Sequence, residues 1–117
     1  MQFDVCPQFE KDFKRLEKKY KTLKDDFVTL KKFLTSTKHP NNYSSFRIDN
    51  LGLSEVVIKL KHIPCRSMKG KGSRTGLRII YVYFEKEERI LFIEFYQKAE
   101  QANEDIERIR EVLAKYK

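Results

Sequence analysis

Basic side chains are concentrated in one acid-free segment near the middle of the chain. Residues 59–78 contain no Asp or Glu, but they contain Lys59, Lys61, Arg66, Lys69, Lys71, Arg74 and Arg78. Like charges repel one another, so such a segment is complemented by an anion or left in water. Arg grips a phosphate through paired hydrogen bonds, and Lys attracts it as a point charge. The segment is therefore a candidate phosphate site, with a solvated basic loop as the alternative.

The net charge of +8 is unevenly distributed along the chain. Residues 1–40 carry a net charge of +4, residues 41–84 carry +6, and residues 85–117 carry −2. A regional asymmetry of this kind produces a directed electric field, which a uniform solubility charge does not. Nucleic acid is the partner that this pattern favours.

The other motifs argue against several kinds of chemistry. The stretch GKGSRTG lacks the GxxxxGK[ST] pattern and does not join a strand to a helix, so we reject a nucleotide-binding loop. His39 and His62 are distant in sequence, and Cys6 and Cys65 form no metal-ligand spacing, so we expect no metal and no cofactor. No apolar run reaches the ~18–20 residues of a membrane helix. Without a signal-peptide pattern at the N-terminus, we expect a cytoplasmic protein with no membrane contact.

The first third of the chain predicts a short strand and two amphipathic helices. Residues 2–5 read as the strand, and Pro7 suits the first turn of a helix. Apolar residues then recur at spacings of four, three and four, as on one helix face. They are Phe9, Phe13, Leu16 and Tyr20, and then Leu23, Phe27, Leu30 and Leu34. Thr22 is the predicted N-cap of the second helix, with Asp25 in a capping-box position. Residues 35–54 are predicted to be a loop.

The remaining sequence predicts three strands and a final helix. The strands are expected at 55–62, 77–84 and 89–98, and Asn103 is the expected cap of a helix with an apolar stripe over 106–113. The links between the strands are too short for parallel crossovers, so the strands should be antiparallel. We therefore predict one α+β domain over 1–117. It would be a small antiparallel sheet with an N-terminal helical hairpin packed on one face and a C-terminal helix.

Strand alternation brings several cations to one face of this sheet. Lys59 and Lys61 point away from their apolar neighbours in the strand. Arg78 lies in an apolar run, where its charge is costly unless it reaches water or an anion. If Arg78 shares a face with Lys61, the two cations converge on the uncovered side of the sheet, and Lys98 closes its other side. The alternative is a solvated face with Arg78 extended to water or paired with Glu94.

The same residues carry a resemblance to a known family. A basic strand, IKLKH, is followed by a loop, by G-x-R-x-x-Y in the next strand, and by RILFIEFYQK, an apolar strand that ends in a basic residue. With the order of elements, this pattern resembles the RelE/ParE superfamily of toxins over nearly the whole chain. The resemblance implies a RelE-like endoribonuclease that cuts mRNA on the ribosome without a metal. The 2′-hydroxyl would attack the adjacent phosphate. A cognate acidic antitoxin is the implied protein partner.

The resemblance also implies roles for individual residues. Arg78 matches an arginine that holds the scissile phosphate, and Lys98 lies near a second functional basic residue. Lys61 or His62 is the candidate general base, because Glu104 occupies the neighbourhood in which some members have a tyrosine. The expected catalytic set is Lys61, His62, Arg78 and Lys98, and the expected RNA-binding set is Lys59, Arg66, Lys69, Lys71 and Arg74.

Two other functions fit the same pattern. One is a ParE-like protein that inhibits DNA gyrase by binding it, with no nuclease activity. The other is a non-catalytic RNA-binding module. The convergent cations Lys61, Arg78 and Lys98 favour the nuclease, because a gyrase inhibitor does not need them.

Overall fold

The chain forms a five-stranded sheet with helices on both faces. The computed structural model describes residues 1–37, 45–49 and 51–116, so His39 and much of the predicted 35–54 loop lie outside the described residues. The elements are β1 Gln2–Val5, α1 Pro7–Lys19, α2 Leu23–Thr37, β2 Ser45–Arg47, β3 Val56–Leu60, β4 Leu77–Phe84, a 3₁₀ turn Glu85–Glu87, β5 Arg89–Gln97 and α3 Ile106–Tyr116. The α+β fold class predicted from the sequence is confirmed.

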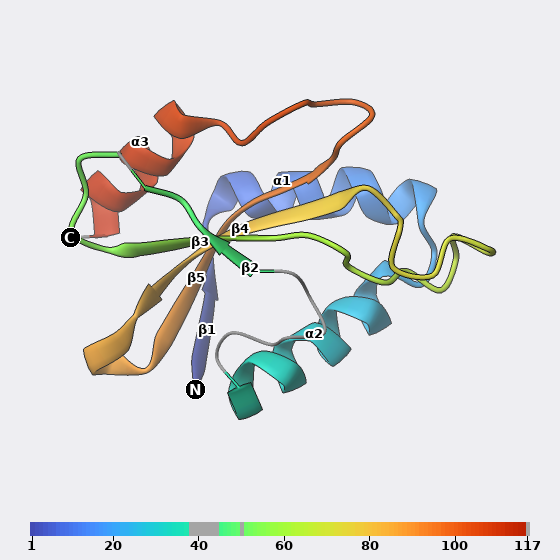
Figure 1. The fold of residues 1–117 in the computed structure, drawn as a ribbon, viewed down its shortest axis with the longest axis horizontal. Helices are drawn as coiled ribbons and strands as arrows, with labels where there is room; N and C mark the ends of the chain where they lie inside the picture. The colour runs from blue at the N-terminus through green and yellow to red at the C-terminus, as the bar shows by residue number, and fades with distance from the viewer. Residues whose placement is uncertain (38–44, 50, 117) are drawn as a thin grey trace.

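The strand order of the sheet is β1-β5-β4-β3-β2. The three consecutive strands β3, β4 and β5 are antiparallel, as their short links predict, and β2 pairs antiparallel with β3. The N-terminal strand β1 pairs parallel with β5, a pairing that the strand pattern alone did not predict. This sheet lies between α2 and α3 in Figure 1.

The helical hairpin of α1 and α2 covers one face of the sheet with aromatic side chains. The Phe9 ring lies 5.4 Å from that of Phe92 and 5.8 Å from that of Phe95, and the Phe27 ring lies 4.9 Å from that of Phe92. Phe92 pairs with Tyr81 in the register, so Tyr81 points to the same face. Offset and edge-on contacts of such rings add to the hydrophobic free energy of burial. The two predicted helices therefore hide their stripes as expected.

Several of the predicted boundaries are wrong. Helix α2 continues to Thr37, and β2 lies at 45–47, inside the segment predicted to be a loop. Three residues are too few to show an alternating pattern, and β2 exists because its backbone pairs with β3. At the other end, α3 begins at Ile106, and Asp105 rather than Asn103 is its cap, because Asp105 Oδ1 accepts the N–H of Arg108.

Thr22 precedes α2 as predicted, but the capping box with Asp25 is absent. Its hydroxyl donates to the carboxylate of Asp26 over 2.8 Å and accepts the backbone N–H of Ser67 over 2.8 Å. The hydroxyl is thus used to bind the basic segment to the start of α2. Sequence spacing does not show this contact, because 45 residues separate its partners.

An ion pair joins α1 to α3 around the open edge of β5. The guanidinium of Arg108 lies 2.6 Å from the carboxylate of Asp12, and it also donates to the carbonyl of Ile93. Asp12 accepts the backbone N–H of Phe95 as well. Residues 93–97 of β5 lie beyond its last pair with β1, so this edge of β5 has no neighbouring strand there. Asp12 and Arg108 therefore supply hydrogen bonds to the backbone groups of Phe95 and Ile93 that a strand would otherwise supply.

We expect Asp12→Asn to destabilise the fold. The change preserves shape but leaves the Arg108 side chain, only 21% exposed, without its counter-ion. The free energy of unfolding in urea should fall by about 3 kcal/mol. Asp25→Asn, at a 75% exposed side chain that also meets an arginine, is the matched control and should change it by less than about 0.5 kcal/mol. Equal effects of the two changes would contradict this account of the ion pair.

Candidate anion-binding site

The register of β3, β4 and β5 places four cations on the face opposite the helical hairpin. Leu60 pairs with Ile79, so continuing the register by one residue sets Lys61 opposite Arg78, and Arg78 pairs with Tyr96. Residues that pair directly in an antiparallel sheet share a face. We call Lys59, Lys61, Arg78 and Lys98 the cationic strip. Lys98 joins it because its N–H bonds to the carbonyl of Gly76 over 2.8 Å, two positions after Tyr96.

Three members of the cationic strip have no ion pair within the described residues. Arg78 is half-buried and donates to the carbonyl of its neighbour Leu77 over 3.1 Å, and Glu94 does not meet it. Lys61 extends its ammonium over the ring of Phe46, 4.8 Å from the centroid. Lys98 is exposed. A phosphate would therefore meet positive groups that no described carboxylate neutralises.

Lys59, the fourth member, is already occupied by a carboxylate of the same chain. Its Nζ lies 3.2 Å from Oε2 of Glu104, and the two side chains are 14% and 16% exposed. Burial acts to lower the pKa of Lys59, but the hydrogen bond with Glu104 and the nearby Tyr96 outweigh it and leave the pKa raised. This face was expected to be uncovered, and that expectation is wrong. Helix α3 lies on this side of the sheet, where Val57 and Val82 are buried (Figure 1). Glu104 covers the face at Lys59.

Tyr96 contributes a buried hydroxyl beside this ion pair. The residue is 2% exposed, and its hydroxyl makes no hydrogen bond of good geometry within the described residues. The Lys59 ammonium is near enough to affect its pKa, although the geometry of the pair falls short of a hydrogen bond. Burial raises the pKa of Tyr96, and Lys59 partly offsets this. The hydroxyl is thus a buried polar group at the site that interacts with the charge of Lys59.

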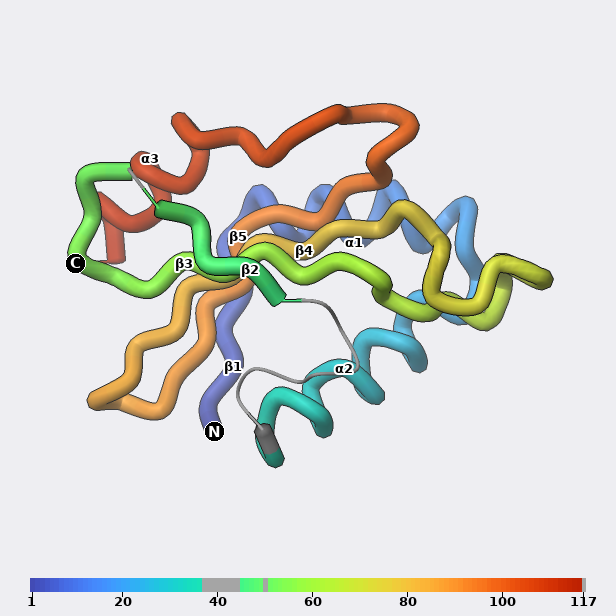
Figure 2. Tube along the Cα trace, in the orientation of Figure 1, coloured from blue at the N-terminus to red at the C-terminus, as the bar shows by residue number. Residues whose placement is uncertain are grey.

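Glu94 holds the segment that carries Glu104. Its carboxylate is 1% exposed and accepts the side-chain N–H of Gln101 over 2.8 Å and the backbone N–H of Asp105 over 2.9 Å. Burial raises the pKa of Glu94 above its ordinary value, and the two hydrogen bonds lower it only in part. Figure 2 shows the chain after β5 running back along the sheet to α3. Glu94 therefore fixes the path that brings Glu104 to Lys59.

The remaining predicted RNA-binding residues lie apart from the strip. Arg66 is paired with Asp25 and Asp26 of α2, on the side of the helical hairpin. Lys69, Lys71 and Arg74 are exposed in the turn between β3 and β4, which projects at one end of the molecule (Figure 2). His62 is exposed directly after Lys61, with a left-handed φ of 54° where the chain leaves the sheet.

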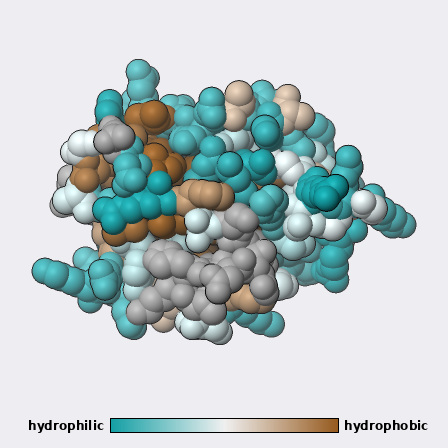
Figure 3. Space-filling view, viewed as in Figure 1, coloured by the Kyte–Doolittle hydropathy of each residue, from teal (hydrophilic) through white to brown (hydrophobic). Residues whose placement is uncertain are grey.

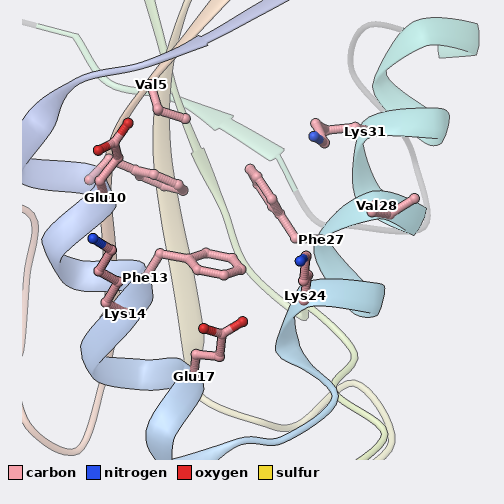
Figure 4. Close-up of a pocket in the computed structure, with 10 residues that line it drawn as sticks. Val5, Glu10, Phe13, Lys14, Glu17, Lys24, Phe27, Val28 and Lys31 are labelled. Atoms are coloured by element: carbon pink, nitrogen blue, oxygen red, sulfur yellow. The ribbon is translucent and has the colours of Figure 1, made fainter.

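An apolar groove of about 390 Å³ lies between α1 and α2. Figure 4 shows Phe13 and Phe27 pointing into it from the two helices, with their ring centroids 5.4 Å apart. Lys24 and Lys31 lie on its α2 side, and Val28 beside them is exposed. The groove lies on the opposite side of the sheet from the cationic strip, so it does not add to the anion site.

The described residues offer neither a metal site nor a membrane-spanning helix. They contain no group of three or more His, Cys, Asp or Glu side chains that could hold a metal ion. None of their helices is long and apolar enough to cross a membrane.

Two features of the site were missed by reasoning from the sequence. Phe46 fell in the predicted loop, so it was assigned no face. The pairing of Glu104 with Lys59 joins residues 45 positions apart, and no local pattern reveals it. Tyr96 was not among the predicted site residues, although its position two residues before Lys98 places both on one face of a strand.

The fold and the site define an α+β protein with a cationic sheet face. No protein-family model and no curated protein sequence matches the chain. The solution structure of the conserved hypothetical protein HP0892 from Helicobacter pylori is similar, with a TM-score of 0.57 and 17% identity over 86% of this chain and 97% of that one. The crystal structure of a metal-bound toxin from Helicobacter pylori is also similar, with a TM-score of 0.59 and 15% identity over 86% and 98%. At sequence identities this low, the structural similarity shows a shared fold alone.

The raised pKa of Glu94 predicts a pH dependence of stability. A carboxyl with a folded-state pKa above its unfolded value of 4.5 loses stabilisation as pH rises through the folded pKa. The unfolding free energy of the wild type, minus that of Glu94→Gln, should therefore fall from about pH 4.5 upward and level off above the folded pKa. Urea unfolding at a series of pH values measures it. A constant or rising difference would contradict the effect of burial on this carboxyl.

Removing the charge of Glu104 should strengthen anion binding. Lys59 then has a neutral neighbour, and its charge, at a side chain only 14% exposed, lacks a carboxylate to match it, so the affinity for inorganic phosphate should rise about tenfold or more. Calorimetry on Glu104→Gln measures this change. Glu107→Gln, at an exposed position on α3, alters the net charge equally and is the control. Equal affinities of the two variants would show that Glu104 does not compete for an anion at Lys59.

Proposed function

We propose that this chain is the toxin of a type II toxin–antitoxin pair and that it cleaves mRNA on the ribosome as a RelE-like endoribonuclease. The observation that carries the proposal is the placement of Lys61, Arg78 and Lys98 on one sheet face, with no ion pair of their own in the described residues. A fold shared with a protein described as a toxin supports it.

The proposed reaction is an internal phosphoryl transfer. The ribose 2′-oxygen forms a bond to the adjacent phosphorus, and the bond from phosphorus to the 5′-oxygen breaks. The products are a 2′,3′-cyclic phosphate and a 5′-hydroxyl. Negative charge accumulates on the pentavalent phosphorus in the transition state, so preplaced cations stabilise that state more than the substrate. Because side chains supply these cations, the proposed reaction does not require a metal.

Each member of the proposed catalytic set has a distinct task. Arg78 binds two phosphate oxygens, which its planar guanidinium suits. His62, or Lys61 in its uncharged form, follows the end of β3 and accepts the proton of the 2′-hydroxyl; when His62 is the base, Lys61 remains a cation beside the phosphate. Lys98, directly after the end of β5, donates a proton to the leaving 5′-oxygen, which becomes the 5′-hydroxyl. His62 is exposed, so substrate can reach it.

RNA binding would use the cations around this set. Lys59 contacts backbone phosphate once substrate displaces Glu104, and the turn with Lys69, Lys71 and Arg74 attracts the strand on either side of the cut. Arg66, which the structure pairs with two aspartates, would contribute only after those ion pairs break. Binding should consequently weaken with salt, as it does wherever phosphate contacts release counterions.

The proposal includes a protein partner and a place of action. An acidic antitoxin would lie across the cationic strip and neutralise it, because charge complementarity steers and orients such contacts. Because the proposed substrate is mRNA on the ribosome, the proposed place of action is the cytoplasm.

Arg78→Ala should abolish growth arrest and slow ribosome-dependent cleavage by about 10²–10³-fold. The loss follows because no other side chain replaces a bidentate phosphate contact. The measurements are growth after induced expression and cleavage of ribosome-bound mRNA, with circular dichroism to confirm folding. Arg15→Ala, at an exposed ion pair on α1, is the matched control and should retain activity. Full toxicity of folded Arg78→Ala would overturn the assignment.

The alternatives predict different products from the same experiments. Mapping transcript ends after expression should reveal cuts phased with codons if the chain is a nuclease. Inhibition of gyrase supercoiling without new transcript ends would identify a ParE-like inhibitor. Salt-sensitive RNA binding without cleavage or growth arrest would identify a non-catalytic RNA-binding module.

A further inference from the structure

Phe46 is a large apolar side chain that the fold leaves in water. It is 48% exposed, although it belongs to a strand. A single exposed apolar residue is common and has no meaning by itself. Its surroundings distinguish it, because they are cationic.

The register places Phe46 on the face of the cationic strip. Phe46 pairs with Lys59, so both side chains point away from the helical hairpin. Figure 3 shows hydrophobic and hydrophilic residues side by side on the surface over β2 and α3. The edge strand β2 therefore adds an aromatic ring to a face that is otherwise defined by charge.

Lys61 links this ring to the proposed phosphate position. Its ammonium lies 4.8 Å from the ring centroid, and the register continued by one residue beyond Leu60 and Ile79 sets the residue opposite Arg78. Strands lie about 4.8 Å apart, so two strand spacings, or roughly 10 Å, separate the β2 and β4 positions across the sheet. An aromatic surface and phosphate-binding cations are thus within the span of neighbouring nucleotides.

We propose that Phe46 is a stacking platform for a nucleobase of single-stranded RNA, next to the phosphate held by Lys61 and Arg78. The inference rests on the proposed function for the identity of the strand. Aromatic side chains beside a cationic track are how proteins bind single strands without reading base edges. The platform would accept any base, because every base has a π face, and it would fix the position of the chain relative to the cut.

The absence of tryptophan from the sequence gives a direct test. Phe46→Trp introduces the only tryptophan of the chain, and its emission reports stacking. We expect a short single-stranded RNA to quench this emission at low salt, and an abasic oligonucleotide of the same length to leave it unchanged. Val28→Trp, at an exposed position on α2, is the matched control and should not respond. Phe46→Leu, which keeps apolar bulk without a ring, should weaken RNA binding about 5- to 150-fold.

The outcomes separate this inference from the proposed function. RNA binding by Phe46→Trp without quenching, or an unchanged affinity of Phe46→Leu, would overturn the stacking platform alone. Loss of a protein partner by Phe46→Leu with undiminished RNA affinity would also overturn it, and would assign the ring to a protein contact. Failure of the wild-type chain to bind RNA at low salt would overturn the proposed function and this inference together.

Discussion

The antiparallel register of β3, β4 and β5 is the constraint on which the rest of the molecule depends. Side chains alternate between the faces of a strand, so one register divides the sheet into an aromatic face and a cationic face. Tyr81 and Phe92 point to the helical hairpin, whereas Arg78 and Tyr96 point away from it. A shift of one residue in the pairing of β4 would bury Arg78 beneath α1 and α2. The strand pairing that forms the core therefore also aligns the cations on the opposite face.

The carboxylates of Glu94, which is buried, and Glu104, which is partly exposed, then determine how accessible the cationic face is. Glu94 binds the chain after β5 through its contacts with Gln101 and Asp105, and this path delivers Glu104 to Lys59. The arrangement neutralises one cation of the strip and leaves Lys61, Arg78 and Lys98 for a ligand. Removal from water makes the charges of Lys59 and Glu104 costly unless each has an opposite charge beside it. A phosphate that displaces Glu104 must therefore neutralise Lys59 as well as the carboxylate does.

Periodic patterns in the sequence predicted most of this fold, and contacts between distant residues account for the remainder. The spacing of Phe9 and Leu16 and the apolar run that follows Gly76 each indicate one element and its buried side. The parallel pairing of β1, the strand at Phe46 and the Glu104–Lys59 pair depend on backbone or charge partners elsewhere in the chain. Within the site, alternation indicated that Lys61 and Arg78 could share a face. It could not indicate that the segment before α3 covers Lys59.

The central claim, that Lys61 and Arg78 receive a phosphate together, is tested most directly by nuclear magnetic resonance during titration with a short single-stranded RNA. If these two residues bind the phosphate together, the Arg78 Nε–H signal and the backbone amides of Lys61 and Lys98 should shift most, whereas signals from the groove between α1 and α2 should remain in place. Saturable binding that shifts the groove signals and leaves Arg78 unchanged would contradict it.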